Sequence, residues 1–221
     1  MSDVARSQEQ LAAWLKLAPV VPILTLQDAA QAVAVARALV AGGLPVIEVT
    51  LRTESALDAI RAIAREVEGA IVGAGTLLSA RQVELASRAG ARFGVAPGAT
   101  LQLLAATEAE GVPFLPGACT PSEIMTLRER GYRTVKFFPA SVVGGVPWLR
   151  ALAAPLPDVT FCATGGIDVR SAPSYLALPN VIAVGGSWLA PREAIAARDW
   201  QAIEILAREA AALRPAGSMQ P

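Results

Sequence analysis

The sequence predicts a single-domain α/β protein, a (β/α)8 or TIM barrel with an extra N-terminal helix. From residue 19 onward, short apolar, β-branched runs alternate with Ala-, Leu-, Arg- and Glu-rich stretches. Eight such units follow one another at a spacing of about 20 to 26 residues. Alternation of this kind favours a parallel sheet covered by helices, and eight units in about 200 residues suit a small closed barrel. An open doubly wound sheet is the competing fold, but no G-x-G-x-x-G motif follows the first strand.

The elements follow one another in a regular order. The predicted strands are Val20–Thr25, Val46–Thr50, Ile71–Ala74, Phe93–Ala96, Phe114–Pro116, Thr134–Phe138, Thr160–Ala163 and Val181–Val184. The predicted helices between them are Asp28–Ala41, Glu54–Glu66, Ala80–Ala89, Leu101–Glu110, Pro121–Arg130, Pro147–Ala153 and Arg170–Ala177. Helix C-caps are expected at Gly42, Gly90, Gly111 and Gly131.

Helices are also expected at both ends of the barrel. An amphipathic helix over Ser7–Leu17 precedes the first strand, and a longer helix over Asp199–Leu213 ends the domain. The last eight residues (RPAGSMQP) are expected to form a loose tail. The chain shows no linker, so residues 1–221 are interpreted as one domain.

Composition excludes several classes of function. The chain has 19 acidic and 19 basic residues, so no basic excess indicates a nucleic-acid or membrane surface. It contains no histidine, so metal sites built on histidine are excluded, and any general acid or base must be another side chain. Cys119 and Cys162 suit two reduced thiols in a cytoplasmic protein. We expect no secretory signal, since the polar N-terminus has no apolar core.

One lysine lies where a charge is unusual. The chain has 17 arginines but only two lysines, Lys16 and Lys136. Lys136 interrupts the apolar strand Thr134–Phe138, and strand alternation predicts that it faces the barrel axis. Burying an ammonium costs free energy unless it is paired or loses its proton, and a free amine is a nucleophile for carbonyls. The alternative is a surface lysine whose side chain reaches water.

A carboxylate lies in a similar place on the second strand. Ile47, Val49 and Leu51 form one apolar face of this strand. Glu48 and Arg52 share the other face, toward the barrel interior. Glu48 is interpreted as a proton shuttle beside the amine, or as a structural ion-pair partner of Arg52 or Lys136. Arg52 follows the strand and is either a carboxylate ligand at the barrel mouth or a plain surface arginine.

Two glycine turns near the end of the chain predict a phosphate site. Thr164-Gly165-Gly166 follows the seventh strand, and Gly185-Gly186-Ser187 follows the eighth. Barrels often bind phosphate with the loops after these two strands, because glycines let backbone N–H groups approach an anion.

Taken together, these motifs resemble the 2-keto-3-deoxy-6-phosphogluconate (KDPG) aldolase family, which includes 4-hydroxy-2-oxoglutarate aldolases. The likeness covers residues 19 to 212, and its specific segments are Glu48–Thr53, Val72–Thr76, Val135–Ala140, Thr164–Gly166 and Gly185–Trp188. The resemblance implies a class I aldolase that splits KDPG into pyruvate and glyceraldehyde 3-phosphate, an Entner–Doudoroff reaction. It also implies a homotrimer and no metal or organic cofactor. One departure is Ala163, where family members often have proline.

The resemblance also implies a role for each site residue. Lys136 is the Schiff-base lysine, and Glu48 is the acid and base. The ligands of the pyruvate carboxylate are Arg52 and Thr76. The walls of the pyruvate end are Pro97 and Phe138. Thr164 contacts the substrate hydroxyls, and the phosphate ligands are Gly165, Gly166, Gly186 and Ser187.

Other functions remain open at this point. The galactonate-derived epimer of KDPG or unphosphorylated 4-hydroxy-2-oxoglutarate is an alternative substrate. A phosphosugar isomerase or epimerase barrel would use the same phosphate site without covalent catalysis. A non-catalytic sugar-phosphate-binding protein is a further alternative.

Overall fold

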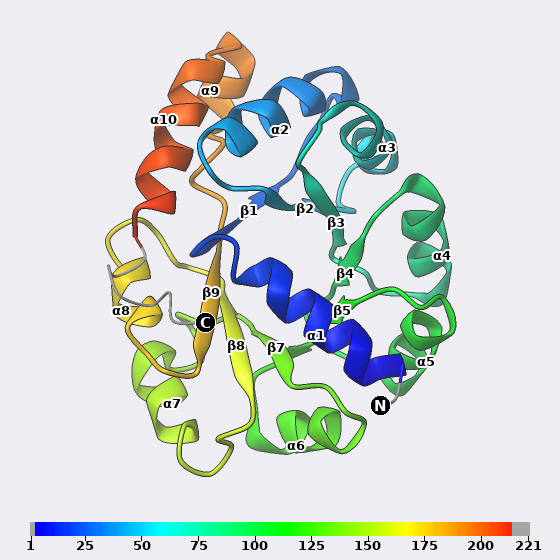
Figure 1. Ribbon diagram of the computed structural model, residues 1–221, viewed down its shortest axis with the longest axis vertical. Coiled ribbons are helices and arrows are strands. Elements are labelled where there is room, and N and C mark those ends of the chain that lie inside the picture. The colour runs from blue at the N-terminus through cyan, green and yellow to red at the C-terminus, as the bar shows by residue number, and fades with distance from the viewer. Residues whose placement is uncertain (1–2, 214–221) are drawn as a thin grey trace.

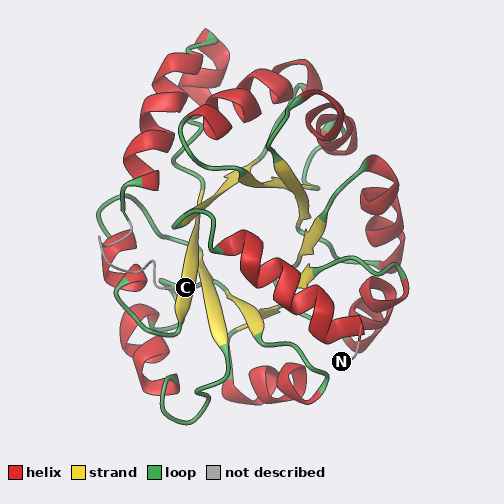
Figure 2. Ribbon diagram, in the orientation of Figure 1, coloured by secondary structure: helices red, strands yellow, loops and turns green. Residues whose placement is uncertain are grey.

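The computed structural model describes residues 3–213, and it forms a barrel of parallel strands enclosed by helices (Figures 1 and 2). The strands pair in the order β5-β4-β3-β2-β1-β9-β8-β7-β6. Their bounds are β1 Val20–Leu24, β2 Val46–Thr50, β3 Ile71–Gly75, β4 Phe93–Val95, β5 Phe114–Leu115, β6 Gly117–Ala118, β7 Thr134–Phe137, β8 Thr160–Thr164 and β9 Val181–Gly186. The predicted barrel with its extra N-terminal helix is confirmed, and the open-sheet alternative is wrong.

The fifth predicted strand is divided in two by Pro116. Its first part, β5, pairs with β4, and its second part, β6, pairs with β7. Proline has no N–H to donate, so it interrupts a ladder. Its carbonyl still accepts a hydrogen bond of 2.8 Å from the Lys136 N–H. Residue Pro116 therefore connects β5 and β6, the two edge strands of the sheet, and β6 lies beside the strand that carries Lys136.

The helices form the outer layer. Their bounds are α1 Asp3–Leu15, α2 Ala32–Ala41, α3 Ala56–Glu66, α4 Ala80–Ala89, α5 Leu101–Ala109, α6 Pro121–Glu129, α7 Gly145–Leu152, α8 Ala172–Leu176, α9 Arg192–Ala197 and α10 Trp200–Ala211. Side-chain oxygens cap several N-termini, as expected for Ser and Thr. At α6, Thr120 and Glu123 form a reciprocal capping box.

The structure corrects several details of the helix prediction. The N-terminal helix spans Asp3–Leu15 rather than Ser7–Leu17. The stretch from Asp28 begins with a short 3₁₀ turn, η1 (Ala29–Gln31), because the Asp28 carboxylate accepts from the Ala30 N–H. The seventh helix begins before Pro147, at Gly145, since proline is tolerated in a first turn. The short helix α9 was not predicted. The tail from residue 214 lies outside the described residues.

A further correction concerns the end of α2. Gly42 has a right-handed conformation (φ −78°), and Gly43 instead adopts the left-handed one (φ 92°). A Cβ on Gly42 would lie 2.4 Å from the Cβ of Ala207. The absence of a side chain at Gly42 therefore allows α10 to pack closely against α2. The other expected C-cap glycines, which include Gly90, do take positive φ values.

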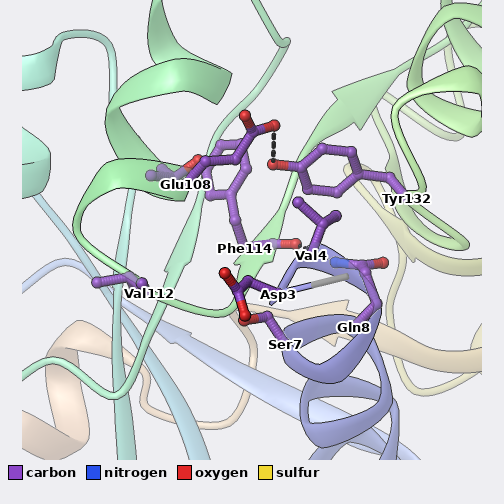
Figure 3. A pocket seen from close by; sticks show the side chains of 10 residues that line it. Asp3, Val4, Ser7, Gln8, Glu108, Val112, Phe114 and Tyr132 are labelled. Carbon is purple, nitrogen blue, oxygen red and sulfur yellow. Dashed lines mark hydrogen bonds between the residues drawn. The ribbon is translucent and has the colours of Figure 1, made fainter. Parts of the chain in front are cut away.

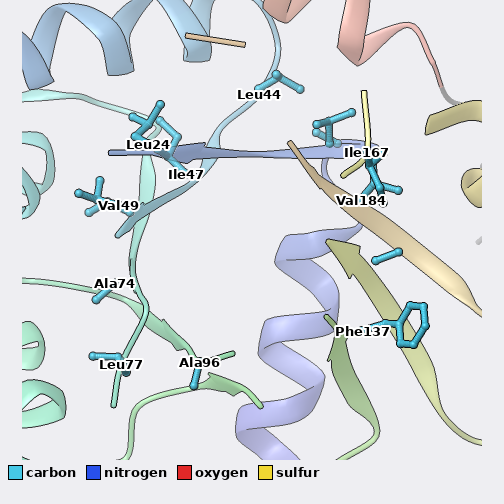
Figure 4. Close-up of a cluster of buried hydrophobic side chains, with 14 of the residues drawn as sticks. Leu24, Leu44, Ile47, Val49, Ala74, Leu77, Ala96, Phe137, Ile167 and Val184 are labelled. Carbon is cyan, nitrogen blue, oxygen red and sulfur yellow. The ribbon is translucent and has the colours of Figure 1, made fainter. Parts of the chain in front are cut away.

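Two apolar clusters divide the interior. The larger one lies between the strands and the helices, and Figure 4 shows part of it, including Leu24, Ile47 and Phe137. The smaller one fills the inside of the barrel and includes Ile71 and Phe93. Because successive side chains of a strand point to opposite faces, these clusters decide which residues face the axis.

Helix α1 closes one end of the barrel (Figure 1). Its residues Leu11 and Leu15 belong to the inner cluster. The buried Gln8 side chain donates to the Phe114 carbonyl at 2.8 Å and accepts from the N–H groups of Arg133 and Thr134. Gln8 therefore satisfies backbone groups at the starts of β5 and β7. The opposite end of the barrel, at the carboxyl ends of the strands, is not covered by α1 and is where a substrate is expected to bind.

No helix within residues 3–213 is long and apolar enough to cross a membrane.

Candidate active site

Lys136 points from β7 into the barrel. Its neighbours Val135 and Phe137 pack in the outer cluster, so strand alternation turns Lys136 inward, as predicted. The lysine is only 6% exposed. A surface lysine that reaches water is therefore the wrong interpretation.

Glu48 reaches the same point from β2. Ile47 and Val49 pack in the outer cluster, so Glu48 faces inward, and it is 3% exposed. The Nζ atom of Lys136 lies 3.4 Å from Oε1 and 3.5 Å from Oε2 of Glu48. A buried pair at this separation compensates part of the cost of removing both charges from water. The predicted pairing of amine and carboxylate is therefore present in the structure.

A buried cysteine lies beside this pair. Cys162 on β8 is the register partner of Lys136 and belongs to the inner cluster. Burial raises the pKa of the Cys162 thiol to about 12, so the thiol is neutral at physiological pH. Cys119 is half-buried, and burial, with a smaller contribution from Glu123, raises its pKa. Both cysteines are free thiols, and Cys162 packs against the lysine as a small apolar group.

Arg52 and Thr76 meet at the mouth. Arg52 is exposed in the turn after β2, and its Nε donates to Thr76 Oγ1 at 3.3 Å. A guanidinium held through Nε keeps its terminal amino groups for a second acceptor. Thr76 follows β3 with φ 59°, a conformation that β-branched residues rarely adopt. The Glu48–Arg52 ion pair suggested by the sequence is absent from the ion pairs of residues 3–213.

Phe138 and Pro97 lie near the same centre. The ring centroid of Phe138 is 5.5 Å from the Lys136 Nζ. Pro97 follows β4 and is half-buried, and a Cβ on Gly117 would lie 2.3 Å from its carbonyl. Gly117 in turn is the register partner of Lys136. Pro97 is therefore held close to the strand segment next to the lysine.

The two glycine turns lie side by side, because β8 and β9 are paired and Thr164 is in register with Gly185. Gly165 and Gly166 take φ values of 103° and 69°, which L side chains rarely adopt. The carbonyls of Thr164 and Gly165 accept from the N–H groups of Ala140 and Ser141.

In a trans peptide the N–H points opposite to the carbonyl, so the Gly165 and Gly166 N–H groups point away from Ala140–Ser141. These two donors suit an anion.

Two neighbours of the site were not anticipated. Ser141 lies against the Gly165–Gly166 turn, since a Cβ on Gly166 would be 1.9 Å from its Oγ. Trp188 covers Gly186, whose Cβ would be 2.1 Å from the indole ring. The sequence carried no signal for the first contact, because Ser141 comes from the turn after β7.

A separate cavity of about 290 Å³ lies at the other end of the barrel, between α1 and the end of α5 (Figure 3). Tyr132 donates to Glu108 in its wall, and burial raises the pKa of Tyr132 to about 12. The lysine–glutamate pair does not line it.

Comparison with known proteins agrees with this geometry. The family model "KDPG and KHG aldolase" matches residues 11–206. The 2-dehydro-3-deoxy-phosphogluconate aldolase of Pseudoalteromonas atlantica is 50% identical over 194 residues, which are 88% of this chain and 90% of the relative.

Two solved structures are similar as well. The first is the KDPG aldolase of Zymomonas mobilis ZM4 with 3-phosphoglycerate, with a TM-score of 0.91 and 43% identity over 96% of this chain and 100% of that one. The second is the KDPG aldolase of Legionella pneumophila, with pyruvate captured at low pH as a covalent carbinolamine. Its TM-score is 0.88, with 40% identity over 91% of this chain and 98% of that one.

A parallel barrel that buries a lysine against a glutamate, with glycine turns at the ends of β8 and β9, suits a class I aldolase, an enzyme of the lyase class. The chain belongs to the family of KDPG and KHG aldolases.

Proposed function

We propose that the protein cleaves KDPG to pyruvate and glyceraldehyde 3-phosphate through a Schiff base on Lys136. The observation that carries this proposal is the 3.4 Å approach of the Lys136 Nζ to the Glu48 carboxylate inside the barrel. The relative from Legionella, which holds pyruvate as a covalent carbinolamine, supports the covalent chemistry. The substrate is a small molecule whose phosphate and carboxylate bind at opposite sides of the amine.

The first half of the reaction builds an electron sink. Lys136 passes its proton to Glu48, and the neutral amine attacks the C2 ketone of the substrate. Glu48 returns this proton to the carbinolamine hydroxyl, which leaves as water, so that an iminium ion and a Glu48 carboxylate remain. Arg52 and Thr76 bind the adjacent carboxylate, and Phe138 and Pro97 bound the pyruvate end.

The second half breaks the carbon chain. Glu48, directly or through a water, takes the proton from the C4 hydroxyl, and the C3–C4 bonding electrons move into the iminium. Glyceraldehyde 3-phosphate leaves, and an enamine of pyruvate remains on Lys136. Protonation at C3 and hydrolysis then release pyruvate and restore the amine.

The far end of the substrate is held by the glycine turns. Backbone N–H groups of Gly165 and Gly166 bind the phosphate, with Gly186 and Ser187 from the neighbouring turn. Thr164, buried at the end of β8, contacts the substrate hydroxyls. Ala163 packs in the outer cluster, and it leaves both glycine φ values in the left-handed range.

The experiment is a lactate dehydrogenase-coupled assay of pyruvate release. It compares KDPG, its galactonate-derived epimer and 4-hydroxy-2-oxoglutarate, and the highest kcat/KM is expected for KDPG. The Lys136→Arg variant is expected to be inactive with all three, because an arginine cannot form the imine. Pyruvate release retained by this variant would contradict the Schiff base on Lys136. No pyruvate release by the wild-type protein from any of the three compounds would instead favour a non-covalent isomerase or epimerase.

We further propose a cytoplasmic homotrimer. The family resemblance supports the assembly, and so do the exposed apolar side chains of Leu101 and Met125 on the neighbouring helices α5 and α6. Light scattering after size exclusion is expected to give three times the chain mass. A monomer at micromolar concentration would contradict the trimer and leave the proposed reaction untouched.

A further inference from the structure

The inner face of β3 carries two glycines near the barrel mouth. Val72 and Ala74 pack outward, so Gly73 and Gly75 occupy inward positions. Neither has a positive φ, so backbone conformation does not call for glycine at either one. Glycine weakens a strand interior and often marks a close approach by another group. The two glycines therefore need a reason that lies in their surroundings.

At Gly75 the approaching group is Glu48. A Cβ built on Gly75 would lie 2.1 Å from Oε1, 2.5 Å from Cγ and 2.6 Å from Cδ of Glu48. The strand register explains this contact. Glu48 is paired with Gly73, and its side chain leans one inward position toward the mouth, over Gly75. The space where a side chain would be is filled by the carboxylate.

Gly73 has a different neighbour. A Cβ there would lie 2.4 Å from the ring of Phe93, which is fully buried in the inner cluster. Gly73 therefore makes room for the Phe93 ring in the core, and Gly75 makes room for the Glu48 carboxylate that faces Lys136.

We propose that Gly75 is a positioning residue, which sets the place of the Glu48 carboxylate opposite the amine of Lys136 by leaving a slot in β3. This inference rests on the proposed role of Glu48 as the proton carrier. A methyl group at residue 75 would displace both the carboxylate and its Cγ. Because Glu48 is buried, the displaced carboxylate would have no solvent to move into, and its distance from the Lys136 Nζ would change.

The first test is a kinetic double-mutant cycle of Gly75→Ala and Glu48→Gln. Gly75→Ala is expected to lower kcat for KDPG cleavage about tenfold to hundredfold, within the range of acid–base help. In the Glu48→Gln background the same change is expected to have no further effect, because there is no base left to displace. An unchanged kcat in Gly75→Ala while Glu48→Gln lowers kcat, or an equal loss in both backgrounds, would overturn the proposal. Gly98→Ala is the matched control, since its Cβ would meet nothing within 4 Å.

The second test needs no catalysis. Gly75→Ala is expected to lower the Tm of the wild-type protein, and this loss is expected to shrink when Glu48→Ala removes the clashing atoms. Gly73→Ala should lower the Tm equally in both backgrounds, because its clash is with Phe93. A loss from Gly75→Ala that is the same with and without Glu48 would rule out the slot. If the Tm cycle shows the clash with Glu48 but neither Gly75→Ala nor Glu48→Gln changes kcat, the proposed role of Glu48 as acid and base is wrong instead.

Discussion

Lys136 on β7 and Glu48 on β2 meet inside the barrel, although the two strands are separated by three others and the residues by 88 positions in the chain. Both side chains are almost fully buried, and each is the main counter-charge of the other. Removing one partner of such a pair leaves an uncompensated charge, so single substitutions affect more than the chemistry.

Replacing Glu48 with Gln keeps the shape of the side chain and removes its ability to take a proton. We expect kcat to fall about a hundredfold to ten-thousandfold. Steady-state kinetics with KDPG measure this, with Glu66→Gln, an exposed carboxylate at the end of α3, as the control. A kcat within about threefold of wild type would exclude Glu48 as the acid and base.

Arg52 is expected to act on binding. Arg52→Ala should raise the KM for KDPG about tenfold to hundredfold with a smaller change in kcat, because a charge-assisted hydrogen bond to the carboxylate is worth about 1.5–3 kcal/mol. Arg65→Ala, an exposed arginine on α3, is the control. An unchanged KM for Arg52→Ala would identify Arg52 as a surface arginine held by Thr76 alone.

The Gln8 side chain ties α1 to the closed end of the barrel. Gln8→Ala would remove three hydrogen bonds and leave the backbone N–H groups of Arg133 and Thr134 without their acceptor. We expect the free energy of unfolding to fall by about 3 kcal/mol, with kcat unchanged. Urea denaturation measures it, and Gln10→Ala on the exposed side of α1 should cost less than about 0.5 kcal/mol. Equal losses from both variants would contradict the bridging role.

The burial of Cys162 predicts that the folded protein loses stability at alkaline pH. Its thiol has an ordinary pKa of 9.0, and burial raises the pKa to about 12 in the folded protein. Between these values the unfolded chain binds fewer protons than the folded one, so stability falls as pH rises. The stability is fully present below about pH 9 and is lost toward pH 12. We expect Cys162→Ala to flatten the decline of the unfolding free energy above pH 9; an identical slope would show that the thiol does not contribute.

The sequence predicted the barrel and the inward direction of both catalytic candidates, because successive side chains along a strand point to opposite faces of the sheet. Ile47 and Val49 fix the phase of Glu48, and Val135 and Phe137 fix that of Lys136. Relations between elements were beyond this reasoning. The overlap of Glu48 with Gly75, the contact of Ser141 with Gly166 and the bridge made by Gln8 all depend on side-chain reach across strands. Nothing local to any of these residues encodes such contacts.

Covalent trapping tests the central claim most directly. The protein is incubated with pyruvate, reduced with borohydride and digested, and the peptides are mapped by mass. We expect one reduced pyruvate adduct, on Lys136, and none in the Lys136→Arg variant. Lys16, the only other lysine in the chain, is an internal control. An enzyme that releases pyruvate from KDPG but stays unmodified at Lys136 would contradict the Schiff-base mechanism.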